Sequence, residues 1–147
     1  MAVKPIPDGF HAVTPTLNIK GAAQLIEFLR SVFGAEERVR IPGPGGAIMH
    51  AEVQIGDSIV MLSEALRQAP APGALFVYVP DADAVYQRAL KAGAQSLMAP
   101  ADMFWGDRFS RVEDPFGNTW EIATHKEDVA PDELQKRAAA FAAPQTS

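Results

Sequence analysis

Residues 112–122 read V-E-D-P-F-G-N-T-W-E-I, and this stretch decides how the whole chain is organised. Its apolar arms flank a Pro/Gly/Asn turn, which predicts two antiparallel strands joined by a tight connection. A weaker copy, A-E-V-Q-I-G-D-S-I-V-M-L, covers residues 51–62. Aligning the glycines of the two turns gives an offset of 61 residues (117 − 56), which places Val60 opposite Glu121. The chain therefore reads as two copies of one unit.

The order of patterns predicts two βαβββ halves, over residues 9–62 and 74–125, joined by a Pro-rich linker over residues 63–73. Helical spacing of apolar residues over 21–33 ends at Gly34, and a second helix follows Asp81 and ends at Gly93. Strands are expected over residues 10–19, 38–41, 48–55, 58–62, 74–79 and 95–98, then a loop over 99–107 and the hairpin over 109–124. Units this small do not bury their faces alone, so we expect the halves to share a sheet.

A third helix is expected over residues 131–142, outside the repeat. Pro131 suits the first helical turn, and Leu134, Ala138 and Phe141 form an apolar stripe. Ala130 is a poor N-cap, so the helix needs packing to persist. It could cover a strand edge of its own chain or contact a second subunit.

Composition limits the classes of function. The 147 residues carry a formal net charge of −5, which argues against nucleic acid or an anionic membrane as the main partner. No apolar run is long enough to span a bilayer, and the N-terminus lacks the apolar core of a signal peptide. The absence of cysteine excludes disulfides and thiolate metal sites. A cytoplasmic protein is the simplest interpretation.

Glu121 is the first candidate functional residue. A carboxylate in an apolar cavity could act as a general base or anchor a ligand. Alternatively, Glu121 is a structural remnant held by Arg111 on the facing arm or by water. The register of the hairpin decides whether Arg111 and Glu121 meet.

His50 and Glu52 alternate on one predicted strand and so share a face. They could line a cavity and orient a substrate or transfer a proton near neutral pH. Their alternation with apolar neighbours is equally typical of the solvent face of an amphipathic strand.

Aromatic residues gather in the second half, at Phe76, Tyr78, Phe104, Trp105, Phe109 and Trp120. Aromatic rings on a loop suit the mouth of a pocket for a flat or hydrophobic ligand. Trp105 is therefore the better candidate for a ligand contact, whereas Trp120 alternates with Glu121 and is expected in the core.

The stretches IEFLRSVFGAEE and VEDPFGNTWEI, in tandem βαβββ order, resemble the vicinal-oxygen-chelate superfamily of glyoxalase I, bleomycin-resistance proteins and extradiol dioxygenases. VTPTLNIKGAA, MHAEVQIGDSIVMLSE and WGDR…DPFGNTWEIATHKEDVAPDE are similar to its PhnB-like branch, over nearly the whole chain. The resemblance implies one α+β domain over residues 1–147, in which the tandem units curl a mixed sheet around a ligand cavity. It also implies a homodimer.

The four ligand positions of the metal-binding members fall on Thr14, Val60, Ala74 and Glu121. Only Glu121 is a good metal ligand, and a divalent ion needs three or four such donors. The resemblance therefore favours a protein that holds a small, partly aromatic or hydrophobic molecule without a metal cofactor. The residues expected to bind this ligand are Thr14, Glu52, Val60, Phe76, Tyr78, Phe104, Trp105 and Arg111. The alternative is a lyase, isomerase or dioxygenase that uses a divalent metal, with Glu121 and His50 in catalytic roles.

Overall fold

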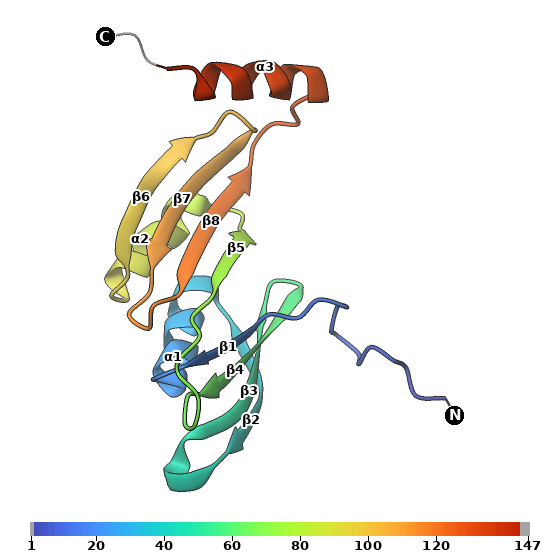
Figure 1. Cartoon of the computed structure of the whole chain (residues 1–147), viewed down its shortest axis with the longest axis vertical. Coiled ribbons are helices and arrows are strands. Elements are labelled where there is room, and N and C mark those ends of the chain that lie inside the picture. Colours follow the sequence, from blue (N-terminus) through green and yellow to red (C-terminus); the bar gives the residue numbers. More distant parts are fainter. Residues whose placement is uncertain (1, 145–147) are drawn as a thin grey trace.

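The computed structural model describes residues 2–144, which form two βαβββ halves and a third helix (Figure 1). The first half contains β1 (Thr16–Ile19), α1 (Ala22–Phe33), β2 (Glu36–Pro42), a 3-10 turn η1 (Pro44–Gly46), β3 (Ile48–Ile55) and β4 (Ser58–Glu64). The second half contains β5 (Ala74–Tyr78), α2 (Ala82–Lys91), β6 (Gln95–Asp102), β7 (Asp107–Glu113) and β8 (Thr119–His125). The helix α3 (Pro131–Ala142) follows.

The strands belong to two mixed sheets of four strands each. The spatial orders are β1-β4-β3-β2 and β5-β8-β7-β6. Two pairs of neighbouring strands, β1 with β4 and β5 with β8, are parallel. The α+β class and the tandem βαβββ order are confirmed. The expectation that the halves share one sheet is wrong, because each half buries one face of its own sheet beneath its own helix.

The helices follow from local sequence. In α1, Leu25, Ile26 and Leu29 are fully buried, and Gly34 ends the helix in a left-handed conformation at φ 67°. In α2, the carboxylate of Asp81 accepts a hydrogen bond from the backbone N–H of Ala84 at 3.1 Å, as an N-cap does. Local sequence therefore marks the end of α1 and the start of α2.

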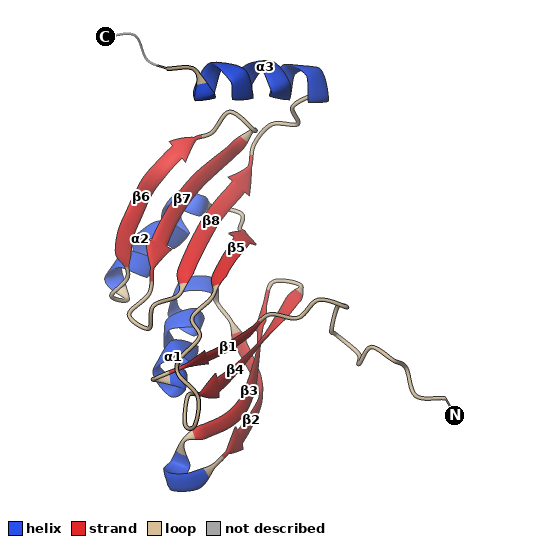
Figure 2. Cartoon of the chain, viewed as in Figure 1, coloured by secondary structure: helices blue, strands red, loops and turns tan. Residues whose placement is uncertain are grey.

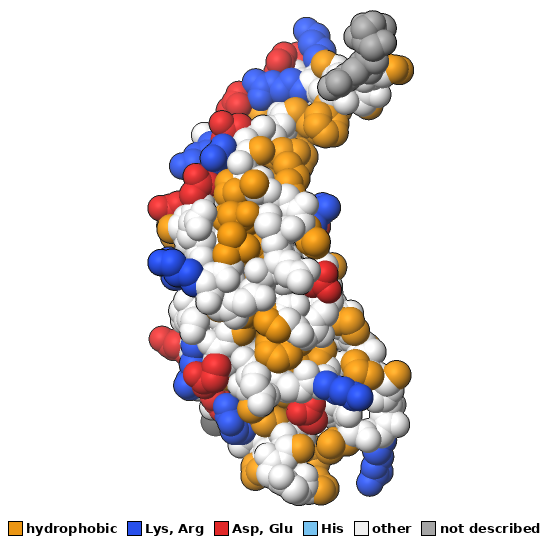
Figure 3. Space-filling view, turned by 90° about the vertical axis from the view of Figure 1, so that its left-hand side faces the viewer, with side chains coloured by type: hydrophobic (Ala, Val, Ile, Leu, Met, Phe, Trp, Pro, Cys, Tyr) orange, Lys and Arg blue, Asp and Glu red, His pale blue; other side chains and the backbone are white. Residues whose placement is uncertain are grey.

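The two helices also join the halves. They pack against each other, and Arg88 of α2 donates from Nε to the carbonyl oxygen of Val32 in α1 at 3.1 Å. Phe33 meets Trp120 with ring centroids 5.2 Å apart, so the apolar core runs through both halves. In Figure 2, α2 lies behind the second sheet and α1 lies beside the first sheet. Each helix packs on one face of its own sheet and leaves the other face free of helices. Seen from the side in Figure 3, the molecule is a crescent whose inner side is formed by these helix-free faces.

The turn between β7 and β8 lies where the halves meet. The carboxylate of Asp114, which is 3% exposed, accepts hydrogen bonds from the backbone N–H groups of Phe116 and Asn118, from Asn118 Nδ2 and from Trp120 Nε1. The ring of Phe116 lies so close to Gly21, at the start of α1, that a Cβ there would come within 2.9 Å of it. The turn therefore fixes the second hairpin against the first helix.

The strands β1 and β6 differ most from their sequence-based expectations. The strand β1 begins at Thr16, not Phe10, and the pairing with β4 starts at the carbonyl oxygen of Pro15, which accepts from Met61 N at 2.9 Å. The strand β6 continues through Pro100 to Asp102, so residues 99–102 of the expected loop over 99–107 are strand. Pro100 is tolerated because β6 is an edge strand and its register with β7 shifts between Met98 and Ala101.

The helix α3 has the expected bounds, and Ala130 makes no side-chain cap. None of its residues is buried. Arg137 ties it to the second half by an ion pair to Glu127 at 2.8 Å and a hydrogen bond to the carbonyl oxygen of Phe104 at 3.3 Å, and pairs within the helix with Glu133 at 3.2 Å. Within residues 2–144, no helix is long and apolar enough to cross a membrane.

Replacing Asp114 by Ala should lower the free energy of unfolding by about 3 kcal/mol, because it leaves several buried donors without an acceptor. Chemical denaturation of the purified variant measures this loss. The matched control is Asp57→Ala in the exposed turn of the first half, which should cost less than about 0.5 kcal/mol. Equal losses in the two variants would contradict the role given to Asp114.

Candidate functional site

The helix-free side of the second sheet carries an aromatic surface. The register of β5, β7 and β8 places Phe76, Tyr78 and Phe109 on this side, opposite the buried Trp120 and Ile122. Phe76 lies 5.0 Å from Tyr78 and 5.8 Å from Phe109 between ring centroids, and Trp105 lies 5.5 Å from Phe109. We call the rings of Phe76, Tyr78, Trp105 and Phe109 the aromatic face. The core position expected for Trp120 is confirmed.

A buried carboxylate fixes two rings of the aromatic face. Oδ2 of Asp107 accepts from the hydroxyl of Tyr78 and from Nε1 of Trp105, both at 2.9 Å. The side chain of Asp107 is 1% exposed. Burial and the hydrogen bond to Asp107 raise the pKa of the Tyr78 hydroxyl, so the ring stays neutral. Tyr78 and Trp105 are therefore held in place before any ligand arrives.

His125 joins this network to the segment that leads into α3. Nδ1 faces Asp107 Oδ1 at 2.8 Å, and Nε2 faces Asp128 Oδ1 at 2.6 Å. A doubly protonated imidazole donates to both carboxylates. Hydrogen bonds to Asp128 and then to Asp107 raise the pKa of His125, although half of its side chain is exposed.

Arg111 and Glu121 meet on the same side of the sheet. They are direct partners in the antiparallel register of β7 and β8, which answers the question that the sequence left open. The ion pair is loose, with 3.4 Å between Arg111 Nη2 and Glu121 Oε1. The guanidinium of Arg111 also lies over the ring of Phe109, 5.7 Å from its centroid.

The first half carries its own polar pair. His50 Nε2 lies 3.0 Å from Glu52 Oε2 on the helix-free face of the first sheet, opposite Ala51 and Val53, which face α1. Both side chains of the pair are partly exposed. His50 and Glu52 are therefore together, but on a different sheet from Arg111 and Glu121.

A cavity of about 700 Å³ opens between the two halves. Its walls are the N-terminal segment before β1, the β3–β4 turn and the edge strand β5, and its floor lies over Phe33 and Trp120. Of the residues predicted to bind a ligand, Val60, Phe76 and Tyr78 line it. Phe76 and Tyr78 thus belong both to the cavity and to the aromatic face.

The remaining predicted residues lie elsewhere. Thr14 precedes β1, where its hydroxyl donates to the carbonyl oxygen of His11 at 3.2 Å. Phe104 lies beside Trp105 with ring centroids 5.1 Å apart, at the end of the aromatic face nearest α3. The structure therefore places Phe76, Tyr78, Arg111 and Glu121 on the second sheet, with Phe104 and Trp105 in the β6–β7 connection beside it. Thr14, His50 and Glu52 lie in the other half.

The alignment of the two halves with an offset of 61 residues is wrong by one residue at β4. Val60 is 3% exposed and belongs to the core beneath α1, as Trp120 does in the second half. Met61 pairs with Glu52 in the way that Glu121 pairs with Arg111. A one-residue slip on a strand moves a side chain to the other face, so Met61, not Val60, is the counterpart of Glu121.

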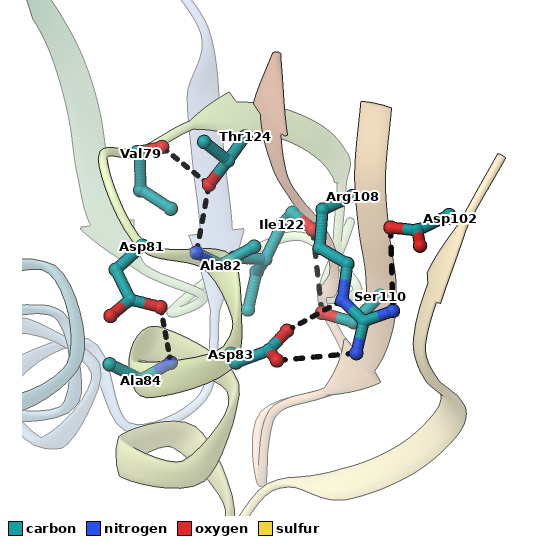
Figure 4. A network of polar contacts seen from close by, with 10 residues as sticks. All are labelled: Val79, Asp81, Ala82, Asp83, Ala84, Asp102, Arg108, Ser110, Ile122 and Thr124. Atoms are coloured by element: carbon teal, nitrogen blue, oxygen red, sulfur yellow. Dashed lines mark hydrogen bonds and ion pairs between the residues drawn. The ribbon is translucent and has the colours of Figure 1, made fainter. Parts of the chain in front are cut away.

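A second cavity of about 480 Å³ lies at the start of α2, on the helix side of the second sheet. Its polar groups already satisfy one another (Figure 4): Arg108 lies 3.0 Å from Asp83 and 3.4 Å from Asp102. Thr124 accepts from the N–H of Ala82 and donates to the carbonyl oxygen of Val79, both at 2.8 Å. These contacts fix α2 on the sheet.

The four carried-over metal positions do not form a donor set. Val60 and Ala74 have no donor atom in their side chains, the hydroxyl of Thr14 already binds a carbonyl oxygen, and Glu121 pairs with Arg111. Among residues 2–144, no three His, Asp or Glu side chains gather closely enough to hold an ion. The residues present do not fit the metal centre that the resemblance implies, and we derive no step through one.

Sequence reasoning missed Asp107 and His125. They are register partners at one end of β7 and β8 and share a face with Arg111 and Glu121. Alternation along the hairpin could have placed all four together, because residues two and four apart on a strand point the same way. The expected loop up to residue 107 hid this signal.

Comparison with known proteins gives a consistent picture. The family model of the Glyoxalase/Bleomycin resistance protein/Dioxygenase superfamily matches residues 10–122. The Mycobacterium bovis protein Mb0911c is 37% identical over 136 residues, which cover 84% of this chain and 90% of that protein. The Escherichia coli protein YjdN is 34% identical over 89 residues, covering 57% of this chain and 60% of YjdN.

Solved structures share the fold. TioX from Micromonospora sp. ML1 has a TM-score of 0.67 and 27% identity, and the match covers 78% of this chain and 98% of TioX. A glyoxalase/bleomycin resistance protein/dioxygenase family enzyme from Burkholderia phytofirmans has a TM-score of 0.63 and 17% identity, covering 76% of this chain and 96% of that one.

The pKa of His125 predicts how stability depends on pH. A raised pKa in the folded state gives a stabilisation that is full below the unfolded value of about 6.5 and is lost as pH rises through the folded pKa. Wild type should therefore exceed His125→Gln in the free energy of unfolding at pH 6, and the gap should narrow by pH 9. Denaturant titrations at both pH values measure the gap. A gap of the same size at both would show that the charge of His125 does not matter.

Proposed function

The chain belongs to the glyoxalase/bleomycin resistance protein/dioxygenase superfamily, and we propose that it binds a small, partly aromatic molecule against its aromatic face. The ligand lies over Phe76 and Tyr78, where the aromatic face adjoins the cavity between the halves. We further propose that it does so without a metal, as a member of the PhnB-like branch.

The observation that carries this proposal is the combination of exposure and rigidity in the rings. Phe76 is 43% exposed and Tyr78 is 61% exposed, and both lie on the edge strand β5 beside the cavity. Exposed clusters of large apolar side chains mark binding sites on folded proteins. Because Asp107 holds Tyr78 and Trp105, these rings lose little further freedom when a ligand stacks on them.

The metal-free part of the proposal rests on the donor set. Lyase, isomerase or dioxygenase chemistry assisted by a divalent ion would need further N or O donors beside Glu121. Thr14, Val60 and Ala74 do not provide them. Binding without catalysis is therefore the function that these residues support best.

We also propose that the protein is a homodimer. The helix-free faces expose Ile41, Phe76 and Tyr78, and β5 and β6 are edge strands with unpaired backbone groups. In α3, Phe141 stays 68% exposed although its ring lies 5.1 Å from Phe104. A second copy over these surfaces would enclose the ligand and give α3 the packing that a short helix needs.

Ligand binding is tested by tryptophan fluorescence with a panel of flat aromatic compounds. We expect saturable quenching in the wild type that is largely lost in Trp105→Phe, because Trp120 is fully buried and should stay silent. The protein should carry no His tag, and the titration should give the same result after dialysis against EDTA.

The outcomes separate the parts of the proposal. Quenching that survives in Trp105→Phe would place the ligand away from the aromatic face. Quenching that disappears with EDTA and returns with a divalent metal would favour the metal-dependent alternative. A panel in which no compound quenches or shifts the melting temperature would count against small-molecule binding.

Deleting the chain from Pro131 onward should weaken the dimer and leave the fold intact, because α3 has no buried residue in its own chain. Light scattering over a dilution series and far-UV circular dichroism measure the two effects. An unchanged dimer with a lower melting temperature would instead place α3 on its own subunit. A full-length protein that is monomeric at micromolar concentration would refute the dimer.

A further inference from the structure

We propose that Arg111 and Glu121 together recognise an uncharged amide-type edge of the ligand, such as a carboxamide or a lactam joined to an aromatic ring. This inference rests on the proposed function and narrows its ligand class. An amide presents a carbonyl acceptor beside an N–H donor, and the pair presents a donor beside an acceptor.

The hydrogen-bonding capacity of the pair is only partly used. The contact of 3.4 Å between Nη2 and Oε1 is long for a charge-assisted hydrogen bond. Arg111 Nε is buried and has no acceptor in the part of the chain that the structure describes. A guanidinium has five N–H donors and a carboxylate accepts several bonds, so both members of the pair can bond to a ligand group that lies over them.

The pair lies in line with the aromatic face. Phe76, Glu121, Arg111 and Met98 are successive register partners across β5, β8, β7 and β6. Neighbouring strands are about 4.8 Å apart, so a ring stacked over Phe76 places a substituent over Glu121 and Arg111. The contact of Arg111 with the ring of Phe109 limits how far the guanidinium can move.

Charge decides between an amide and an ion. A ligand carboxylate that approaches Arg111 also meets Glu121 and, two residues further along β7 on the same face, Glu113. A ligand cation that approaches Glu121 meets Arg111. Only a neutral group with both a donor and an acceptor gains from each member of the pair without repulsion from the other.

Three probes of nearly equal shape separate these cases, namely 2-naphthamide, 2-naphthoate and 2-naphthamidine. We expect the wild type to bind the neutral amide about tenfold more tightly than either ion, measured by isothermal titration calorimetry. Arg111→Met should reverse the order in favour of the amidine, because Glu121 then stands alone. Glu121→Gln should favour the carboxylate, because Arg111 is then unopposed.

A matched pair on the convex side provides the control. Arg30 and Glu27 of α1 lie 3.3 Å apart, so Arg30→Met and Glu27→Gln make the same chemical changes away from the proposed site. These two variants should keep the wild-type order of the probes.

The remaining outcomes distinguish the two proposals. If the probes bind the wild type equally well and no variant changes their order, the role of the Arg111–Glu121 pair is refuted, while binding on the aromatic face stands. If naphthoate binds best and Arg111→Met abolishes this, the site is an anion site and the amide class is wrong. If none of the three probes binds at millimolar concentration, the proposed amide class of ligand is refuted. The fluorescence panel then tests separately whether aromatic compounds bind.

Discussion

The carboxylate of Asp114 accepts four hydrogen bonds inside the molecule, and the arrangement of both halves depends on it. Two of these bonds shape the turn, and the bond to Trp120 fixes the indole at the centre of the core. Trp120 in turn meets Phe33 at the end of α1, and Phe116 of the turn packs on Gly21 at its start. A single buried acceptor thereby links the local geometry of one hairpin to the position of a helix in the other half.

The two halves have the same topology but different surfaces. The first sheet presents His50 and Glu52 on its bare face, whereas the second presents aromatic rings beside Arg111 and Glu121. In the second sheet, the buried carboxylate of Asp107 accepts hydrogen bonds from Tyr78 and Trp105 and so holds both rings in fixed positions. We propose that the second sheet carries the ligand site, and the first half contributes to the cavity between them.

The crescent shape leaves both helix-free faces open, which limits how strongly one chain alone could hold a small ligand. A small ligand is held well when most of its surface is buried. The aromatic face covers one side of a flat molecule, so a second wall is needed from the first half across the cavity or from another subunit. The exposed rings of Phe76, Tyr78 and Phe141 are consistent with either source of that wall.

Local sequence determines many elements of this fold, whereas the strand pairing and the contacts of the site are set by the tertiary structure. Spacing, capping residues and turn chemistry predicted the helices α1, α2 and α3, the hairpin around Gly117 and the buried position of Trp120, because each depends on neighbours within a few residues. Other features depend on which strands pair and in what register. These are the division into two sheets, the continuation of β6 through Pro100, and the identity of Met61, not Val60, as the counterpart of Glu121. The network of Tyr78, Trp105, Asp107 and His125 joins residues up to 47 positions apart (125 − 78). Alternation along one hairpin places Asp107 near His125, but only the pairing of β5 with β8 brings Tyr78 within hydrogen-bonding distance of Asp107.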